Sequence, residues 1–287
     1  MRGLADAAPE VLLARLGAET STIRIGTGGV LLPHYSALKV AEQFRMLETL
    51  TPGRIDLGIG RAPGGTSRVA AALASRDIER FPDQVRDVVD YLDGTLPPDH
   101  PFASIAAMPS GDSSPEVWLL GSSDYSAALA AELGLPFAFA HFISGDAPDV
   151  VRMYRRRFRP SSRAAEPRVL VAVSAILADT RDEAEQLAGT IDLWRLRIRR
   201  GIDLPVPSLH EARAYPYGES ERAEIAYNRR RLILGAVPAA RERIESLVEA
   251  HTADEALVLT IAPDYAARER SYRLLADALA LSPLVAA

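Results

Sequence analysis

One short polar run combines the residue types that hold a phosphate, and it reads Gly121-Ser122-Ser123-Asp124-Tyr125-Ser126. It leaves a predicted strand and opens a predicted helix. The free backbone N–H groups of a first helical turn, the positive end of the helix dipole and nearby hydroxyls together favour an anion. The alternative is that Ser123 or Asp124 only caps the helix, because these residue types are common caps.

A second anion-binding candidate is Arg61, which follows Gly58-Ile59-Gly60 at the end of another predicted strand. Small residues let a ligand approach the backbone closely, and a guanidinium group pairs well with phosphate. A surface arginine in a salt bridge within its own loop explains the same pattern. The local sequence leaves both interpretations open.

Two histidines follow predicted strands, and ligands of parallel α/β proteins bind at that end of the sheet. His34 follows Leu32-Pro33, and His141 follows Ala140. An imidazole there can act as an acid or a base. A structural hydrogen-bonding role is the alternative, so neither residue is assigned as catalytic. The remaining histidines receive no role; they are His100, His210 and His251.

Other motifs are absent or have a simpler explanation. No metal-ligand motif and no G-x-S-x-G nucleophile elbow is present. The glycines of Gly26-Thr27-Gly28-Gly29 lie within a predicted strand, so they indicate close packing or ring approach and not a dinucleotide fingerprint. The arginine runs 155–157 and 229–231 are interpreted as solvated helix faces.

Short apolar runs alternate with helical patterns, which is typical of βα units and a parallel sheet. We expect six strands, over residues 23–32, 55–60, 117–120, 137–140, 168–177 and 256–261. We expect helices over residues 9–18, 36–50, 83–93, 124–134, 180–200, 219–234, 239–250 and 265–279.

No change in composition marks a linker, so residues 1–287 are expected to form a single domain. A Pro-rich excursion near 96–115 is expected to be a long loop. The region near 180–235, with its irregular Pro-containing stretch up to Tyr217, is expected to be an insertion.

Composition indicates an ordinary globular protein. The 287 residues are 48% hydrophobic and carry a formal net charge of −5, which argues against a broad basic surface for nucleic acid. The absence of cysteine excludes disulfides and thiolate chemistry. No apolar segment has the length of a signal sequence or membrane span, so we expect a cytoplasmic protein.

Several of these segments resemble the bacterial-luciferase-like flavin-dependent oxidoreductases, in particular their alkanal-monooxygenase-like branch. The most specific stretch runs from Pro33 to Ala62 and includes Pro33-His34-Tyr35-Ser36 and Gly58-Ile59-Gly60-Arg61-Ala62. The resemblance continues through Met108-Pro109, residues 117–123, Gly134-Leu135-Pro136 and residues 138–142.

The resemblance implies a TIM-type (β/α)8 barrel that binds FMN, or in some branches the deazaflavin F420, at the carboxyl ends of its strands. Arg61 matches an arginine that contacts the flavin phosphate, and Ser123 and Ser126 match hydroxyl residues at the same site. With Gly121 and Ser122 they form the expected cofactor site. Family members begin with two further strands and an acidic-His motif, so we expect an N-terminally truncated barrel of about six βα units with no counterpart of the family's catalytic histidine.

The implied function is a flavin-dependent monooxygenase that uses reduced FMN and O₂ on a small organic substrate. An NAD(P)H-dependent flavin reductase is the expected partner, and exposed barrel edges favour a homodimer. One alternative is an F420-dependent oxidoreductase on the same barrel. The other is a flavin-binding partner protein without catalytic activity.

Overall fold

The computed structural model describes residues 8–62, 67–73, 78–235 and 237–281. The described helices are α1 Pro9–Glu19, α2 Ala37–Leu50, α3 Ser67–Ala72, α4 Phe81–Asp93, α5 Asp124–Leu133, α6 His141–Ser144, α7 Pro148–Arg157, α8 Arg181–Arg199, α9 Leu209–Ala214, α10 Glu219–Arg229, α11 Val237–Ala250 and α12 Tyr265–Ala278, with 3-10 turns η1 Leu32–His34 and η2 Ile78–Arg80. The described strands are β1 Ile25–Gly26, β2 Val30–Leu31, β3 Ile55–Gly60, β4 Glu116–Gly121, β5 Phe137–Ala140, β6 Val169–Leu177, β7 Leu232–Gly235 and β8 Glu255–Leu259.

Contacts divide the chain into two units, which are described separately. Of the described residues, those within 8–138 and 154–168 form the amino-terminal unit, and those within 139–153 and 169–281 form the carboxyl-terminal unit. The expectation that residues 1–287 form a single domain stays a prediction.

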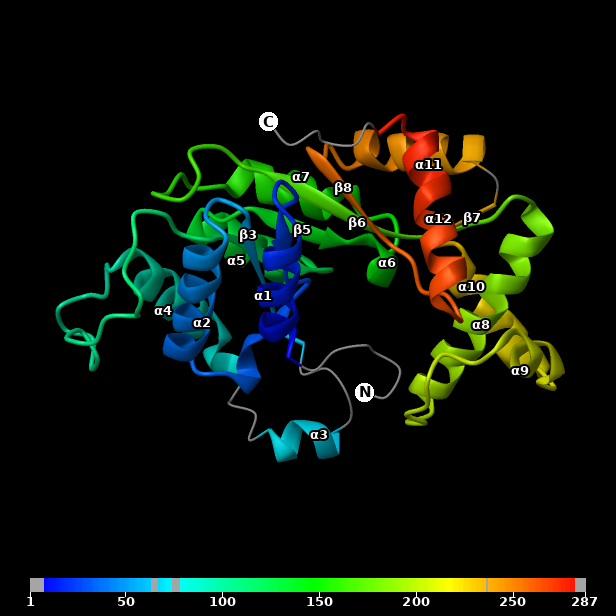
Figure 1. Cartoon of the computed structure of the whole chain (residues 1–287), viewed down its shortest axis with the longest axis horizontal. Coiled ribbons are helices and arrows are strands. Elements are labelled where there is room, and N and C mark those ends of the chain that lie inside the picture. Colours follow the sequence, from blue (N-terminus) through cyan, green and yellow to red (C-terminus); the bar gives the residue numbers. More distant parts are fainter. Residues whose placement is uncertain (1–7, 63–66, 74–77, 236, 282–287) are drawn as a thin grey trace. The chain divides into compact units, whose positions relative to one another are not determined.

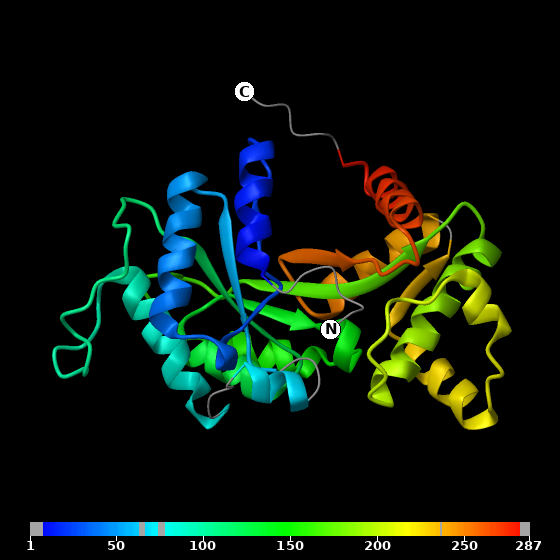
Figure 2. The same cartoon turned by 60° about the horizontal axis from the view of Figure 1, so that its bottom comes forward.

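In the amino-terminal unit, β3 pairs in parallel with β1 and β2 on one side and with β4 on the other. Leu57 of β3 lies opposite Val117 of β4. Helices α1 and α2 pack together, and α2 also packs against α4 (Figure 2). The buried core includes Phe44, Phe81 and Leu119. Because β3 and β4 are parallel neighbours, residues that follow them emerge at the same edge of the sheet.

The strand expected over residues 23–32 is two short strands with a bend between them. Glycines bring this segment against β3, since a Cβ atom on Gly29 would lie 2.5 Å from the carbonyl oxygen of Gly58. A Cβ atom on Gly58 would likewise overlap the backbone oxygen of Thr27. The glycines of this run therefore allow two backbones to pack closely, and the bend interrupts the ladder that an uninterrupted strand would form.

In the carboxyl-terminal unit, β6 is the central strand. It pairs in parallel with β7, where Ser174 lies opposite Leu232, and with β8, where Leu170 lies opposite Glu255. Helices α11 and α12 pack against each other and against β6, and β8 runs beside β6 (Figure 1). Helix α8 covers β6 and β7 through the apolar residues Leu187 and Ile191.

The prediction of a helix through residue 234 is wrong, because α10 ends at Arg229 and residues 232–235 form β7. Leu232 and Ile233 are buried in the strand. A run of three apolar residues is compatible with a helix or with a strand, and here the pairing with β6 makes the run a strand. The described residues thus contain eight strands and not the six expected. Between Gly94 and Pro115 the structure has turns and no helix or strand.

Candidate functional site

The site at the carboxyl ends of β3 and β4 is built from Arg61 and the first turn of α5. The guanidinium carbon of Arg61 lies 4.1 Å from the centroid of the Tyr125 ring. Tyr125 is the second residue of α5, so this stacking holds the arginine beside the helix N-terminus. Two anion-binding candidates that are far apart in the sequence are therefore neighbours in the structure.

Ser123 occupies the N-cap position of α5 in an extended conformation, and its side chain makes no capping hydrogen bond. Asp124 instead accepts a hydrogen bond at Oδ1 from the backbone N–H of Tyr125, with an N···O distance of 2.9 Å. The capping alternative is thus wrong for Ser123, whereas Asp124, the first residue of α5, does bond to a free N–H of the first turn. The Ser123 hydroxyl is not used by the helix that it precedes.

Gly121 and Ser126 form the floor of this turn. A Cβ atom on Gly121 would overlap both the Cβ and the Oγ of Ser126. Ser126 is only 7% exposed, whereas Ser122 and Ser123 are half-buried. Glycine at position 121 therefore lets the start of α5 pack directly against the end of β4, and the hydroxyls of Ser122 and Ser123 remain at the surface of the turn.

The two strand-end histidines lie in different surroundings. His34 ends η1 and is half-buried in the amino-terminal unit. His141 begins α6 and is only 1% exposed, and its Nε2 lies 2.9 Å from Oδ1 of Asp146. The His141 ring also meets the ring of His251 edge-on, with 5.9 Å between centroids.

His251, to which the sequence assigned no role, is buried beside His141. Its ring stacks on Phe139 at 5.3 Å, and its Nδ1 lies 3.0 Å from the carbonyl oxygen of Leu247. A carbonyl only accepts, so Nδ1 carries the proton. No local signal marks a histidine just after a helix as buried, because its burial depends on a strand more than a hundred residues earlier.

The charge of the His141 group is set by burial and by one carboxylate. Burial lowers the pKa of His141, against the opposing effect of its hydrogen bond to Asp146. Partial burial alone would raise the pKa of Asp146, but hydrogen bonds from His141 and Arg243 outweigh it and the pKa is lowered. The imidazole is therefore held towards its neutral form and the carboxylate towards its ionised form.

The arginine run 229–231 is not simply a solvated face. Nε and Nη2 of Arg229 donate to the carboxylate of Asp192 at 2.6 to 3.0 Å, and Asp192 is only 4% exposed. Arg231 donates to the carbonyl oxygen of Ile143 and to Asn228. Only Arg230 is exposed. The sequence shows the charge of these residues but not the acceptors that distant residues such as Asp192 and Ile143 provide.

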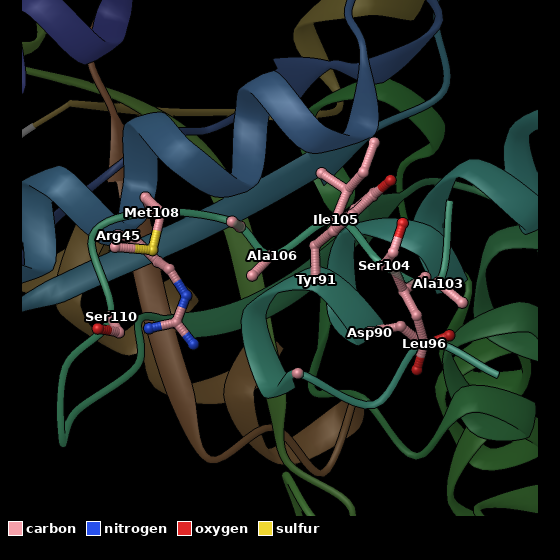
Figure 3. A pocket seen from close by; sticks show the side chains of 12 residues that line it. Arg45, Asp90, Tyr91, Leu96, Ala103, Ser104, Ile105, Ala106, Met108 and Ser110 are labelled. Carbon is pink, nitrogen blue, oxygen red and sulfur yellow. The ribbon is translucent and has the colours of Figure 1, made fainter. Parts of the chain in front are cut away.

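A pocket of about 270 Å³ lies elsewhere in the amino-terminal unit, between α2, the end of α4 and the segment around residues 103–110. Figure 3 shows Arg45 beside Met108, and Asp90 near Leu96 and Ala103 on the other side. The end of α4 leads towards the start of β4, so this pocket lies at the amino ends of the strands. It is separate from the Arg61 turn.

Two kinds of feature are absent from the described residues. No described helix is long and apolar enough to span a membrane. Among the same residues, no three His, Asp or Glu side chains are grouped so that they could hold a metal ion.

The profile of the luciferase-like monooxygenases matches residues 3–267 of this chain. The chain belongs to the luciferase-like monooxygenase family. This family member is 44% identical over 280 residues to the uncharacterized protein YceB of Bacillus subtilis, covering 96% of this chain and 85% of YceB. It is 35% identical to the N-acetyl-S-alkylcysteine monooxygenase of the same organism, with 96% and 84% of the two chains covered.

Solved structures agree with this assignment. The crystal structure of apo-MsnO8 is 39% identical and superimposes with a TM-score of 0.86, covering 96% of this chain and 82% of that one. A 3,6-diketocamphane monooxygenase component in complex with FMN, at 20% identity and a TM-score of 0.61, shares the fold over 97% of this chain and 84% of its own. The α/β fold with its parallel sheet is therefore that of the luciferase-like proteins.

Proposed function

We propose that this chain binds FMN, with the phosphate at the first turn of α5, and acts as a flavin-dependent monooxygenase that uses reduced FMN and O₂ on a small organic substrate. The observation that carries this proposal is the position of Arg61, stacked on Tyr125 at the N-terminus of α5. Membership of the luciferase-like monooxygenase family supports the reaction class.

The residues of the turn fit a phosphate. Arg61 supplies a guanidinium fork, Ser122 and Ser123 supply hydroxyls, and α5 supplies the positive end of its dipole. Gly121 and Ser126 set the backbone of the turn by their close contact. The negative charge of Asp124 repels a phosphate, but its carboxylate accepts a hydrogen bond from the backbone N–H of Tyr125.

Bound FMN supplies the redox chemistry with O₂, which no side chain can perform. The contribution of the chain is to bind, orient and shield. Arg61 and the α5 turn anchor one end of the cofactor, and the apolar strands restrict water at the other. No side chain is assigned here as the acid or base of the reaction.

We infer a (β/α)8-type barrel architecture, supported by the parallel pairing of β3 with β4 and of β6 with β7, and by the likeness to MsnO8. We also infer that an NAD(P)H-dependent flavin reductase delivers reduced FMN and that the chain forms a homodimer. Neighbours described as an oxygenating constituent or oxygenase component support the reductase.

The test is a titration of FMN fluorescence with the purified chain. Arg61→Ala should weaken FMN binding at least several-fold, because a hydrogen bond to a charged group contributes about 1.5–3 kcal/mol. Arg15→Ala is the matched control, since Arg15 is exposed on α1 and pairs with the exposed Glu19 of the same helix. Equal affinity in wild type and Arg61→Ala would exclude the phosphate role of Arg61.

The same titration separates the alternatives. An F420-dependent alcohol dehydrogenase shares the fold at 12% identity and a TM-score of 0.66, so F420 is the second cofactor to test. Tighter binding of F420 than of FMN would favour a deazaflavin oxidoreductase. FMN binding without substrate-dependent O₂ consumption, in the presence of a flavin reductase, would favour a non-catalytic flavin-binding protein.

A further inference from the structure

Arg61 is held at the start of α5 by an aromatic ring and not by a carboxylate. Its guanidinium carbon lies 4.1 Å from the centroid of the Tyr125 ring, whereas the other arginine–ring stacks of the described residues have distances of 5.0 to 5.7 Å. A ring face attracts a guanidinium group through the quadrupole of its π electrons. The shortest of these stacks therefore belongs to the arginine of the candidate phosphate site.

The chain does not use the N–H donors of Arg61. In the part of the chain that the structure describes, no carboxylate, carbonyl or hydroxyl oxygen accepts a hydrogen bond from Arg61, and no ion pair reaches it. The Asp124 carboxylate accepts instead from the backbone N–H of Tyr125. By contrast, Arg163 and Arg229 both donate to carboxylates. A guanidinium group that is held by its face keeps its whole in-plane fork of donors for a ligand.

Stacking on a neutral ring also preserves the charge that attracts a phosphate. A carboxylate partner would offset the positive charge of Arg61 and would compete with the phosphate for the same donors. The ring restricts a long and flexible side chain without that competition. Less conformational entropy is then lost when the phosphate binds, because the guanidinium group is already in place.

The first turn of α5 sets the position of the ring. Tyr125 is the second residue of α5, and this turn packs against the end of β4 where Ser126 meets Gly121. The Tyr125 side chain is 38% exposed, and among the described residues its hydroxyl group has no hydrogen-bond partner. A role for Tyr125 therefore belongs to its ring face and not to its hydroxyl group.

We propose that Tyr125 is a positioning residue for the cofactor phosphate, and that through Arg61 it makes the chain select a flavin with a terminal phosphate. This inference rests on the function proposed above, because it concerns the same cofactor site. The ring holds the guanidinium group by its face, and the fork of Arg61 donates to the phosphate oxygens.

The experiment compares two flavins that share one ring system. FMN ends in a phosphate and riboflavin ends in a hydroxyl group, so the ratio of their affinities isolates the phosphate site. Both are titrated with the purified chain by flavin fluorescence, and wild type should bind FMN more tightly than riboflavin. Tyr125→Leu should lower this ratio about three- to tenfold, the range that a cation–π contact gives, and should leave the riboflavin affinity unchanged.

Two single variants control for the ring and for its place. Tyr125→Phe keeps the ring face without the hydroxyl group, so it should keep the wild-type ratio. Tyr265→Leu is the matched control, because Tyr265 is an exposed tyrosine in the first turn of another helix, α12. It should bind both flavins like wild type.

A double-mutant cycle shows whether the ring acts through Arg61. Arg61→Ala should lower the affinity ratio at least as far as Tyr125→Leu does, and Arg61→Ala/Tyr125→Leu should lower it no further than Arg61→Ala. Additive losses would overturn the proposal, because they would mean that Tyr125 supports phosphate binding without Arg61.

Two further results would also overturn the positioning role. One is an unchanged ratio in Tyr125→Leu together with a lower ratio in Arg61→Ala, which would leave the proposed FMN site intact. The other is an equal loss of FMN and riboflavin affinity with a lower melting temperature, which would indicate that the ring only supports the fold. If wild type does not prefer FMN to riboflavin, the proposed phosphate site itself is wrong, and the role of Tyr125 is wrong with it.

Discussion

The charge state of His141 depends on groups from three segments of the carboxyl-terminal unit. Asp146 lies between α6 and α7, Arg243 lies on α11, and His251 follows α11. Arg243 donates to both Asp146 oxygens at 3.3 Å, which fixes the carboxylate against Nε2 of His141. Of this set, only the two histidine rings are fully enclosed, so a proton on His141 has little access to water.

Stability should fall when His141 becomes protonated. Its pKa in the folded chain is lower than the ordinary value of about 6.5, so the unfolded chain binds the proton more readily. Its contribution to the free energy of unfolding is complete above pH ~6.5 and is lost as the pH falls below that value. The pKa of Asp146 is also lowered, and its contribution is lost only in more acidic solution.

The measurement is the melting temperature at pH 7.5 and pH 5.5. The decrease between the two should be smaller for His141→Gln than for wild type. His210→Gln, on the exposed face of α9, should behave like wild type. An identical decrease in all three proteins would show that His141 does not titrate in this range.

At this scale the sequence predicts exposed and strand-end chemistry better than buried chemistry. The position of Arg61 and Ser123 after two strands could be predicted, because parallel strands send their following residues to one edge. Their role in binding an anion stays a prediction. The burial of His251 was not predicted, because a polar residue at the end of a helix is buried only through elements distant in the chain. The acceptor of Arg229 is likewise 37 residues away.

Among the elements, α5 depends on the absence of a side chain at position 121. Gly121→Ala should destabilise the fold by about 1–3 kcal/mol, because the new methyl group overlaps Ser126. Gly111→Ala is the control, since a Cβ there meets no atom within 4 Å. The double variant Gly121→Ala/Ser126→Gly should recover part of the loss in urea unfolding, and no recovery would argue against this contact.

The turns between α4 and β4 depend on one arginine from the segment after α7. Arg163 donates to the Asp93 carboxylate at 2.5 and 3.2 Å, to the Pro115 carbonyl at 2.9 Å and to Ser114 at 3.1 Å. The side chain is 10% exposed, so these bonds are largely protected from solvent. They hold both ends of a segment that has no helix or strand of its own.

Removing this arginine should make the segment easier to cleave. Arg163→Ala leaves the Pro115 carbonyl and Asp93 without their donor, so local opening becomes more frequent. Limited proteolysis should then cut between residues 96 and 115 at least several-fold faster than in wild type. Cleavage at an unchanged rate would mean that other contacts hold the segment.

The pattern of apolar residues predicts some strands of this chain correctly and misses one. The bounds of β3 and β5 agree with those expected, because each is a compact apolar run between glycine or proline signals. β7 was missed because its apolar residues continue the pattern of the preceding helix. Its identity as a strand is decided by the neighbouring β6 and not by its own composition.

At the scale of the whole molecule, we expect the two units to unfold together. The sequence predicts one domain, and one domain should give a single calorimetric transition whose van't Hoff enthalpy equals the calorimetric enthalpy. Two resolved transitions would contradict the single domain. FMN should then raise only the transition of the amino-terminal unit, which contains Arg61 and α5.

The pairing of β6 with β8 also has a consequence for synthesis on the ribosome. The backbone N–H of Val169 donates to Asp254, 85 residues later. At a translation rate of about 5–20 residues per second, one edge of this nine-residue apolar strand waits roughly 4–17 s for its partner. During that interval β6 is an unprotected β-edge, and a nascent chain stalled before residue 255 should be a preferred client of chaperones that bind extended apolar segments.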